Sequence, residues 1–163
     1  MRRVSAAMVA LLVSTGTLRA GEYTAGDIQA MALNMYHEAR GEGPLGMLAV
    51  GWVVLNRMAD KNYPSTVTAV VHQGCQFSWV CDRRSDGPRD AGAWRAALEL
   101  AAELLVHPIP DPTRGALWYH ASSVRDPGFG HRVTRVAQIG GHVFYARANT
   151  PSSDDRRLLI ASR

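Results

Sequence analysis

The chain has 163 residues, of which 47% are hydrophobic and 20% charged, a composition typical of one globular domain and not of a disordered chain. The formal net charge is +4, but Arg2, Arg3 and Arg19 supply most of that excess. The remainder is nearly neutral, so we expect no nucleic acid partner.

The first 20 residues have the layout of a secretory signal peptide. Two arginines follow Met1, a mostly apolar run extends from Val4 to Val13, and small polar residues lead to Ala20. The apolar run spans about 15 Å as a helix, too short for a stable anchor in a bilayer core about 30 Å thick. A leader helix packed on the domain is the alternative.

This layout predicts three segments. Residues 1–20 form the signal peptide, 21–148 the folded domain and 149–163 a polar tail. We expect a monomer that is exported to the periplasm or the cell envelope, with no stable membrane anchor.

The first two predicted helices follow the leader. Thr24 and Asp27 form a variant of the capping box at the start of a helix that ends near Gly41. Pro44 suits the first turn of a second helix at about 45–58. This second helix is apolar on almost all sides, which predicts that it is buried at the centre of the domain.

Two further helices flank a long loop. A short helix is predicted over 65–72 with Ser65 as its cap, and Asp90 caps a long helix over 91–106. The segment 73–90 between them is rich in Gly, Asp, Arg and Pro, and a loop of this length is usually functional.

Cys75 and Cys81 lie within this loop. In an oxidising compartment they can form a disulfide that closes a small ring. A metal-binding pair is the alternative, but paired zinc ligands usually have two to four residues between them. The spacing favours the disulfide.

The C-terminal part of the domain predicts a small β element. Residues 116–120 are typical of a short strand, and 133–139 and 142–146 predict a hairpin around Gly140 and Gly141. The expected fold class is therefore α+β, mostly α, in a single domain.

Two candidate catalytic carboxyl groups lie at the end of the first predicted helix. On a helical wheel, Glu38 falls at the border of the apolar stripe and Glu42 nearer its centre. Burial raises the pKa of a carboxyl group, as a general acid requires. The alternative is that both glutamates form salt bridges with Arg40 and Arg57.

Metal and cofactor motifs are not found. The pair His37 and Glu38 would begin a zinc-protease motif only with histidine at position 41, which is glycine. We therefore expect neither a metal nor a cofactor.

Several segments together resemble the SleB/CwlJ-type cell wall hydrolases, the catalytic domain family of spore-cortex-lytic enzymes. The resemblance covers about residues 28–147 and suits a single-domain proteobacterial or phage-like member. It is carried by Glu38-Ala-Arg-Gly-Glu42, Val54-Leu-Asn-Arg57, Cys75-Gln-Phe-Ser-Trp-Val-Cys-Asp82, Ala116-Leu-Trp-Tyr-His120 and Ile139-Gly-Gly-His-Val-Phe-Tyr145.

This resemblance implies a lysozyme-like or lytic-transglycosylase-like fold and a peptidoglycan glycan strand as the substrate and partner. It assigns the catalytic role to Glu38, as an acid and then a base that leaves 1,6-anhydro-muramic ends. Glu42 is a possible second carboxylate or a structural residue that pairs with arginine or caps loop amides. An N-acetylmuramoyl-L-alanine amidase and a non-catalytic peptidoglycan-binding protein are the alternatives.

Aromatic rings with polar tips suit a glycan groove, where they stack on sugar faces and form hydrogen bonds. For Phe77 and Tyr145, core packing is an equal alternative. Loop arginines such as Arg89 could meet the carboxylates of peptide stems, or could simply be solvated. The expected substrate-binding residues are Gln76, Phe77, Tyr119, His120 and Tyr145.

Overall fold

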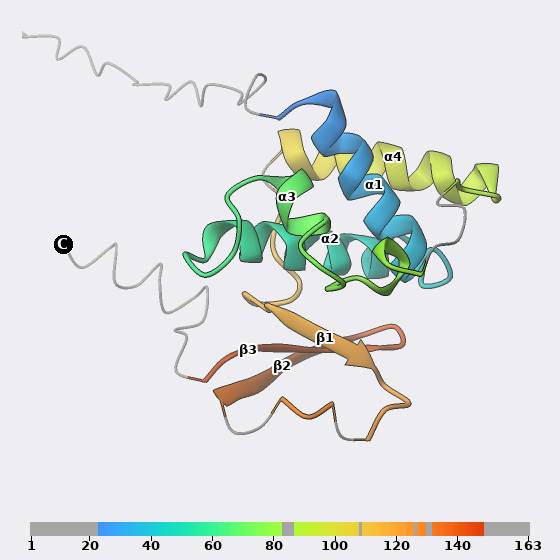
Figure 1. Ribbon diagram of the computed structural model, residues 1–163. Coiled ribbons are helices and arrows are strands. Elements are labelled where there is room, and N and C mark those ends of the chain that lie inside the picture. The colour runs from blue at the N-terminus through green and yellow to red at the C-terminus, as the bar shows by residue number, and fades with distance from the viewer. Residues whose placement is uncertain (1–22, 83–86, 108, 126, 130–131, 149–163) are drawn as a thin grey trace, which may run out of the picture.

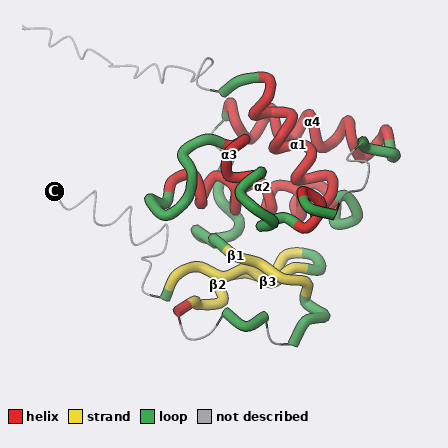
Figure 2. Tube along the Cα trace, viewed as in Figure 1, coloured by secondary structure: helices red, strands yellow, loops and turns green. Residues whose placement is uncertain are grey.

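The computed structural model describes residues 23–82, 87–107, 109–125, 127–129 and 132–148. The predicted signal peptide and the predicted tail at 149–163 lie outside the described residues. In the described part, the helices gather on one side and a small sheet lies on the other (Figures 1 and 2). None of the described helices combines the length and the hydrophobicity needed to cross a membrane.

The two long outer helices begin at the predicted caps. Helix α1 (Ala25–Ala39) starts after Thr24, whose hydroxyl accepts the amide of Asp27 at 3.1 Å while the Asp27 carboxylate accepts the amide of Thr24 at the same distance. Helix α4 (Ala91–Val106) starts after Asp90, whose carboxylate accepts two amides of the first turn. Both predicted helix starts are confirmed, because a capping side chain satisfies amides that have no partner inside the helix.

The segment between these helices departs from the prediction. Helix α3 (Val67–Val71) is shorter than predicted and is capped by Thr66, not by Ser65. The Thr66 hydroxyl accepts the amide of Ala69 at 3.3 Å. The following loop contains a short 3₁₀ helix, η1 (Ser78–Val80), that was not predicted. The disulfide between Cys75 and Cys81 is confirmed.

Helix α2 (Gly43–Ala59) lies between the other helices and the sheet (Figure 1), as its apolar sequence predicts. Gly51 allows close approach to its neighbours, because a Cβ atom there would lie 2.3 Å from Met35 of α1 and 2.8 Å from Leu104 of α4. On its other side, Ala49 and Val53 pack against Phe144 of the sheet. Helix α2 thus contributes to both hydrophobic clusters of the domain.

The sheet has three antiparallel strands, β1 (Trp118–Ala121), β2 (Val133–Ile139) and β3 (His142–Arg147), in the order β1-β3-β2. The hairpin of β2 and β3 is confirmed, with an irregularity between Arg135 and Ala137 that was not predicted. Strand β1 begins two residues later than the predicted start at 116.

The pairing of β1 with β3 decides which aromatic side chains face the helices. Tyr119 lies opposite Phe144, which packs on α2, so both point toward the helices. Trp118 lies opposite Tyr145, and these neighbours in sequence point to the other face because side chains alternate along a strand. The sheet therefore has an inner face toward the helices and an outer face away from them.

Candidate active site between the end of α1 and the sheet

Glu38 lies on the last turn of α1, half-buried, where the helix end meets the inner face of the sheet. The hydroxyl of Tyr119 on β1 donates to Oε2 of Glu38 at 2.9 Å. This bond joins residues that are 81 positions apart in the sequence. The carboxylate is thus fixed through one oxygen, while Oε1 has no hydrogen bond within the described part of the chain.

Tyr119 is enclosed by the inner face of the sheet. Its ring meets the ring of His142 edge-on, with centroids 5.0 Å apart, and lies 5.6 Å from the ring of Phe144. Burial, followed by the nearby Glu38 carboxylate, raises the pKa of Tyr119 well above its usual value. The hydroxyl therefore stays protonated and acts as the donor to Glu38.

Arg57 of α2 is buried beside this contact, with 4% of its surface exposed. Its Nε donates to the carbonyl of Leu117 at 2.8 Å, and its guanidinium lies over the rings of Tyr63 and Phe77. Burial lowers the pKa of Arg57, while Tyr63, Tyr119 and Glu38 act in the opposite direction. Arg57 thus places a positive charge in the neighbourhood of Glu38.

The expected salt bridges of the two glutamates with Arg40 and Arg57 are not formed among the described residues. Arg57 is held by a backbone carbonyl and aromatic rings instead. Arg40 lies over the ring of Tyr36. Neither glutamate is neutralised by a direct partner of this kind.

Glu42 does not share a helix with Glu38, so the helical-wheel placement of Glu42 is wrong. Helix α1 ends at Ala39, and Glu42 occupies the cap position of α2. Gly43 takes a φ of +71°, a left-handed conformation that glycine adopts without strain, and the chain turns there. The carboxylate of Glu42 is consequently carried across to the tip of the β2–β3 hairpin.

At that tip Glu42 is tightly surrounded. It accepts the amide of Gly141 at 2.5 Å, and its Oε1 lies 3.5 Å from Nδ1 of His142. A Cβ atom at Gly140 would lie 1.8 Å from Oε2 of Glu42, so only glycine fits at that position. Glu42 thus accepts a loop amide at the hairpin tip and does not pair with an arginine among the described residues.

His120 and Tyr145 lie on the outer face of the sheet. Their rings stack with centroids 5.4 Å apart, and Nε2 of His120 is 3.0 Å from the hydroxyl of Tyr145. Phe129 packs edge-on against both rings. The structure therefore separates these two expected substrate contacts from Glu38 and Tyr119 on the inner face.

The residues of the loop between α3 and α4 differ in their exposure. Gln76 is exposed, whereas Phe77 is 1% exposed and packs in the helical core under Arg57. Core packing therefore holds for Phe77, which offers a substrate almost no surface. Trp79 is 6% exposed, and its indole nitrogen donates to Oδ1 of Asn34 at 3.1 Å.

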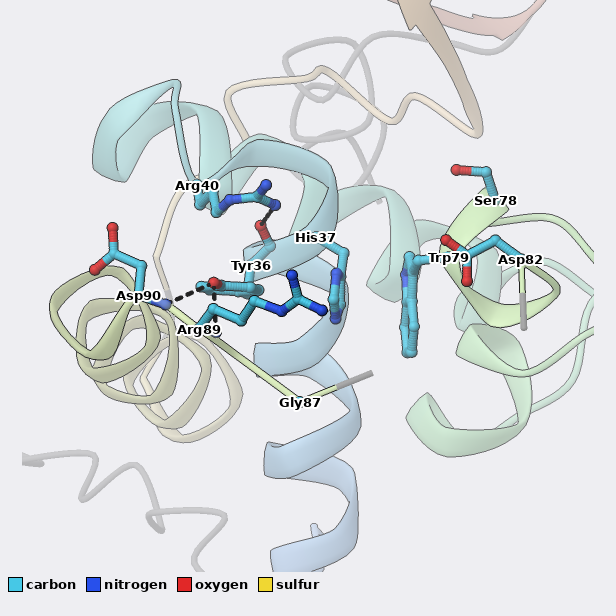
Figure 3. Close-up of a pocket in the computed structure, with 9 residues that line it drawn as sticks. All are labelled: Tyr36, His37, Arg40, Ser78, Trp79, Asp82, Gly87, Arg89 and Asp90. Carbon is cyan, nitrogen blue, oxygen red and sulfur yellow. Dashed lines mark hydrogen bonds between the residues drawn. The ribbon is translucent and has the colours of Figure 1, made fainter. Parts of the chain in front are cut away.

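A pocket of about 570 Å³ opens beside the site, between α1, η1 and the start of α4. Sequence reasoning missed this pocket, although Arg40, the C-cap of α1, comes three positions after His37 and so faces the same side. Figure 3 shows the side chains around it. They are Tyr36, His37, Arg40, Ser78, Trp79, Asp82, Gly87, Arg89 and Asp90.

No group of three or more His, Cys, Asp or Glu side chains in the described ranges is arranged to hold a metal ion. Glu42 and His142 approach each other without a third such residue beside them. The inner face offers the carboxyl group of Glu38, the phenol of Tyr119 and the imidazole of His142, with the guanidinium of Arg57 nearby.

The model of a family described as cell wall hydrolase matches residues 41–145, beginning just after Glu38. Spore cortex-lytic enzymes are similar over most of the chain. The one from Halalkalibacterium halodurans is 33% identical over 75% of this chain and 35% of its own length. The one from Bacillus cereus is 32% identical over 79% of this chain and 48% of its own length. The chain thus spans about a third to a half of these relatives.

Solved structures show the same fold. The catalytic domain of the Bacillus cereus SleB protein has a TM-score of 0.61 and 31% identity over 77% of this chain and 94% of that one. The catalytic domain of a germination-specific lytic transglycosylase SleB from Bacillus anthracis has a TM-score of 0.62 at the same identity and chain coverage, and 98% of it is covered. The predicted lysozyme-like α+β fold is confirmed.

Proposed function

Because the chain belongs to the cell wall hydrolase family, we propose that it degrades peptidoglycan by cleaving the glycosidic bond between N-acetylmuramic acid and N-acetylglucosamine. The contact between Glu38 and Tyr119 carries this proposal. It holds one carboxyl group at the junction of helix and sheet with its second oxygen available to a substrate. The similarity to SleB catalytic domains at 31% identity supports the same substrate class.

In the proposed reaction Glu38 is both acid and base. Protonated Glu38 donates its proton to the glycosidic oxygen as the bond to C1 of the muramic sugar breaks. The positive charge that develops on this sugar is shared by its own N-acetyl group. The Glu38 carboxylate then removes the proton from the C6 hydroxyl, whose oxygen attacks C1. The products are a 1,6-anhydro end and a new free hydroxyl, and no water is consumed.

Tyr119 and Arg57 assist this cycle without touching the reacting atoms. The Tyr119 hydroxyl holds Oε2, which leaves Oε1 as the oxygen that carries and recovers the proton. The buried charge of Arg57 stabilises the carboxylate that exists between the two proton transfers. Both are positioning residues in this proposal.

The surroundings of Glu42 support the single-carboxylate route. A two-carboxylate glycosidase needs its second group free to act as a nucleophile or to activate water. Glu42 is instead bonded to the Gly141 amide and packed against Gly140. We therefore favour transglycosylation over hydrolysis.

Mass spectrometry of purified peptidoglycan digested by the protein tests this function. We expect muropeptides that are lighter by one water than hydrolysis products, and we expect Glu38→Gln to form none. Glu99→Gln, an exposed change on α4, is the matched control and should digest like the parent. Reducing muramic ends would show that water is the acceptor, and release of free stem peptides would show an amidase.

The wall lies outside the cytoplasm, so this function requires export. We propose that residues 1–20 direct the chain to the periplasm or the cell envelope and are then removed. N-terminal sequencing of the exported protein should begin at Gly21, and an intact Met1 would contradict cleavage.

A further inference from the structure

The pocket beside the candidate active site has a polar character of its own. Arg40 follows the end of α1, and Arg89 lies just before α4. Figure 3 shows both arginines on one side of the pocket and Ser78 and Asp82 on the other, next to Trp79. The pocket thus has two cationic donors together with Asp90 on one side, and the oxygen acceptors Ser78 and Asp82 on the other.

Both guanidinium groups are available. Neither Arg40 nor Arg89 forms an ion pair within the described residues, and both are exposed. The Arg40 guanidinium donates one long hydrogen bond of 3.5 Å to the carbonyl of Tyr36 and lies over the Tyr36 ring. Asp90, the carboxylate next to Arg89 in sequence, accepts the amides of Gly92 and Ala93 through its Oδ1 and forms no ion pair with either arginine in the described part of the chain.

The walls of the pocket are fixed by contacts that do not depend on a ligand. The Tyr36 hydroxyl accepts the amides of Arg89 and Asp90, each at 3.0 Å. The imidazole of His37 stacks on the indole of Trp79 at 4.8 Å with planes 18° apart. The Cys75–Cys81 disulfide closes the loop that carries Trp79. Such a preformed site loses little ordering entropy when it binds.

We propose that this pocket binds the peptide stem of the glycan strand through its carboxylate groups. The proposal rests on the proposed function, because it concerns the same substrate. Arginine side chains match carboxylates with two parallel hydrogen bonds. Asp82 and Ser78 can accept the N–H groups of the same peptide. A zwitterionic or acidic peptide fits this distribution better than a neutral sugar does.

Glu38 and the pocket residue His37 lie next to each other on α1, so one substrate can reach both the candidate active site and the pocket. His37 and Glu38 are consecutive, so their side chains point about 100° apart around the helix. A stem of four residues extends about 13 Å. This length suffices to pass around the end of a helix about 10–12 Å across, from a sugar at Glu38 to the pocket.

Direct binding tests the proposal independently of any cleavage. A free stem tetrapeptide is titrated calorimetrically into the full chain, beside the same peptide with its carboxylates amidated. We expect binding of the free acid only, weakened about tenfold by Arg40→Gln or by Arg89→Gln. Arg95→Gln, an exposed arginine on α4 outside the pocket, is the matched control and should bind like the parent.

Equal binding by parent and pocket variants, equal binding of the amidated peptide, or no binding by the parent would overturn the proposal. Thermal melting of each variant checks that it is folded. None of these readouts requires the protein to cleave glycan, so failure of the proposed function would leave them informative.

Turnover supplies the second test. The ratio of kcat/KM on stem-bearing strands to kcat/KM on strands stripped of their stems should fall about tenfold in the pocket variants. An unchanged ratio would overturn the proposal. Absence of cleavage of both strands by the parent would instead contradict the proposed function.

Discussion

Tyr119 and Tyr145 are two tyrosines of one small sheet that have opposite surroundings. The hydroxyl of Tyr119 donates to Glu38 on the inner face. The hydroxyl of Tyr145 contacts His120 on the outer face. Replacing each tyrosine by phenylalanine therefore distinguishes an effect on the candidate active site, expected at position 119, from a general effect on the stability of the sheet.

We expect Tyr119→Phe to lower kcat about tenfold or more with little change in KM. The Glu38 carboxyl is then no longer held by a hydrogen bond, while the surface that contacts the substrate is unchanged. The substitution should cost about 1 kcal/mol of stability through the lost hydrogen bond. Tyr145→Phe should cost similar stability without the loss of kcat. Steady-state kinetics and chemical denaturation of both variants provide the measurement, and equal kcat values would refute the positioning role.

Sequence alone indicated Glu38 and Tyr119 as candidate site residues but could not predict the hydrogen bond between them. Trp118, Tyr119 and His120 are consecutive aromatic residues, so no polar and apolar alternation indicates which of them faces inward. The answer depends on the register between β1 and β3, which the packing of Phe144 on α2 determines. For that reason Tyr119, His120 and Tyr145 were predicted together as substrate contacts, whereas the structure places Tyr119 beside Glu38 and the other two on the outer face.

At the scale of elements, Glu42 ties the start of α2 to the tip of the β2–β3 hairpin. Its carboxylate accepts the Gly141 amide and fills the space where a side chain at Gly140 would lie. The helical wheel could not foresee this tie, because it assumed that α1 continues beyond Ala39. The starts of α1 and α4 were predictable from local caps, whereas this contact spans 99 residues.

This contact predicts that two glycines with almost the same φ angle respond differently to substitution by alanine. Gly140 has a φ of +54° and Gly74 a φ of +57°, but only Gly140 has Glu42 where its Cβ would be. Both Gly→Ala changes carry the strain of a left-handed residue, about 1 kcal/mol. Gly140→Ala should cost about 2 kcal/mol more because it displaces the Glu42 carboxylate from its amide.

Urea denaturation of the two variants measures the difference. In a double-mutant cycle, Glu42→Ala should remove most of the extra cost of Gly140→Ala. Equal destabilisation at Gly74 and Gly140 would contradict the tie.

Across the whole molecule, Asp27 couples the start of α1 to α3. Its Oδ2 accepts from Thr24, and its Oδ1 accepts the amide and the hydroxyl of Thr68 at 3.1 and 2.8 Å. Burial opposes ionisation of this carboxyl, but the hydrogen bonds from Thr24 and Thr68 outweigh it and lower the pKa from 3.8 to about 2. The ionised form is therefore favoured in the folded protein.

A lowered folded pKa stabilises the protein above the unfolded value, and this stabilisation is lost as the pH falls through the folded value. We expect Asp27→Asn to cost about 1–2 kcal/mol near neutral pH. The difference from the parent should shrink between about pH 4 and pH 2. Urea midpoints across that range measure it, and a difference that does not depend on pH would contradict this account.

The bond between Glu38 and Tyr119 also has a consequence for the time at which the enzyme becomes active. The chain is synthesised from its N-terminus, so α1 and α2 emerge well before Tyr119, which follows Glu38 by 81 residues. Strand β1 can pair only after β3 has been synthesised, because β3 is its one neighbour in the sheet among the described strands. On the proposed mechanism, a nascent or truncated chain that carries Glu38 without β3 has no positioned acid and cannot cut the wall. On this mechanism, the enzyme becomes active only when β3 has been completed and has paired with β1.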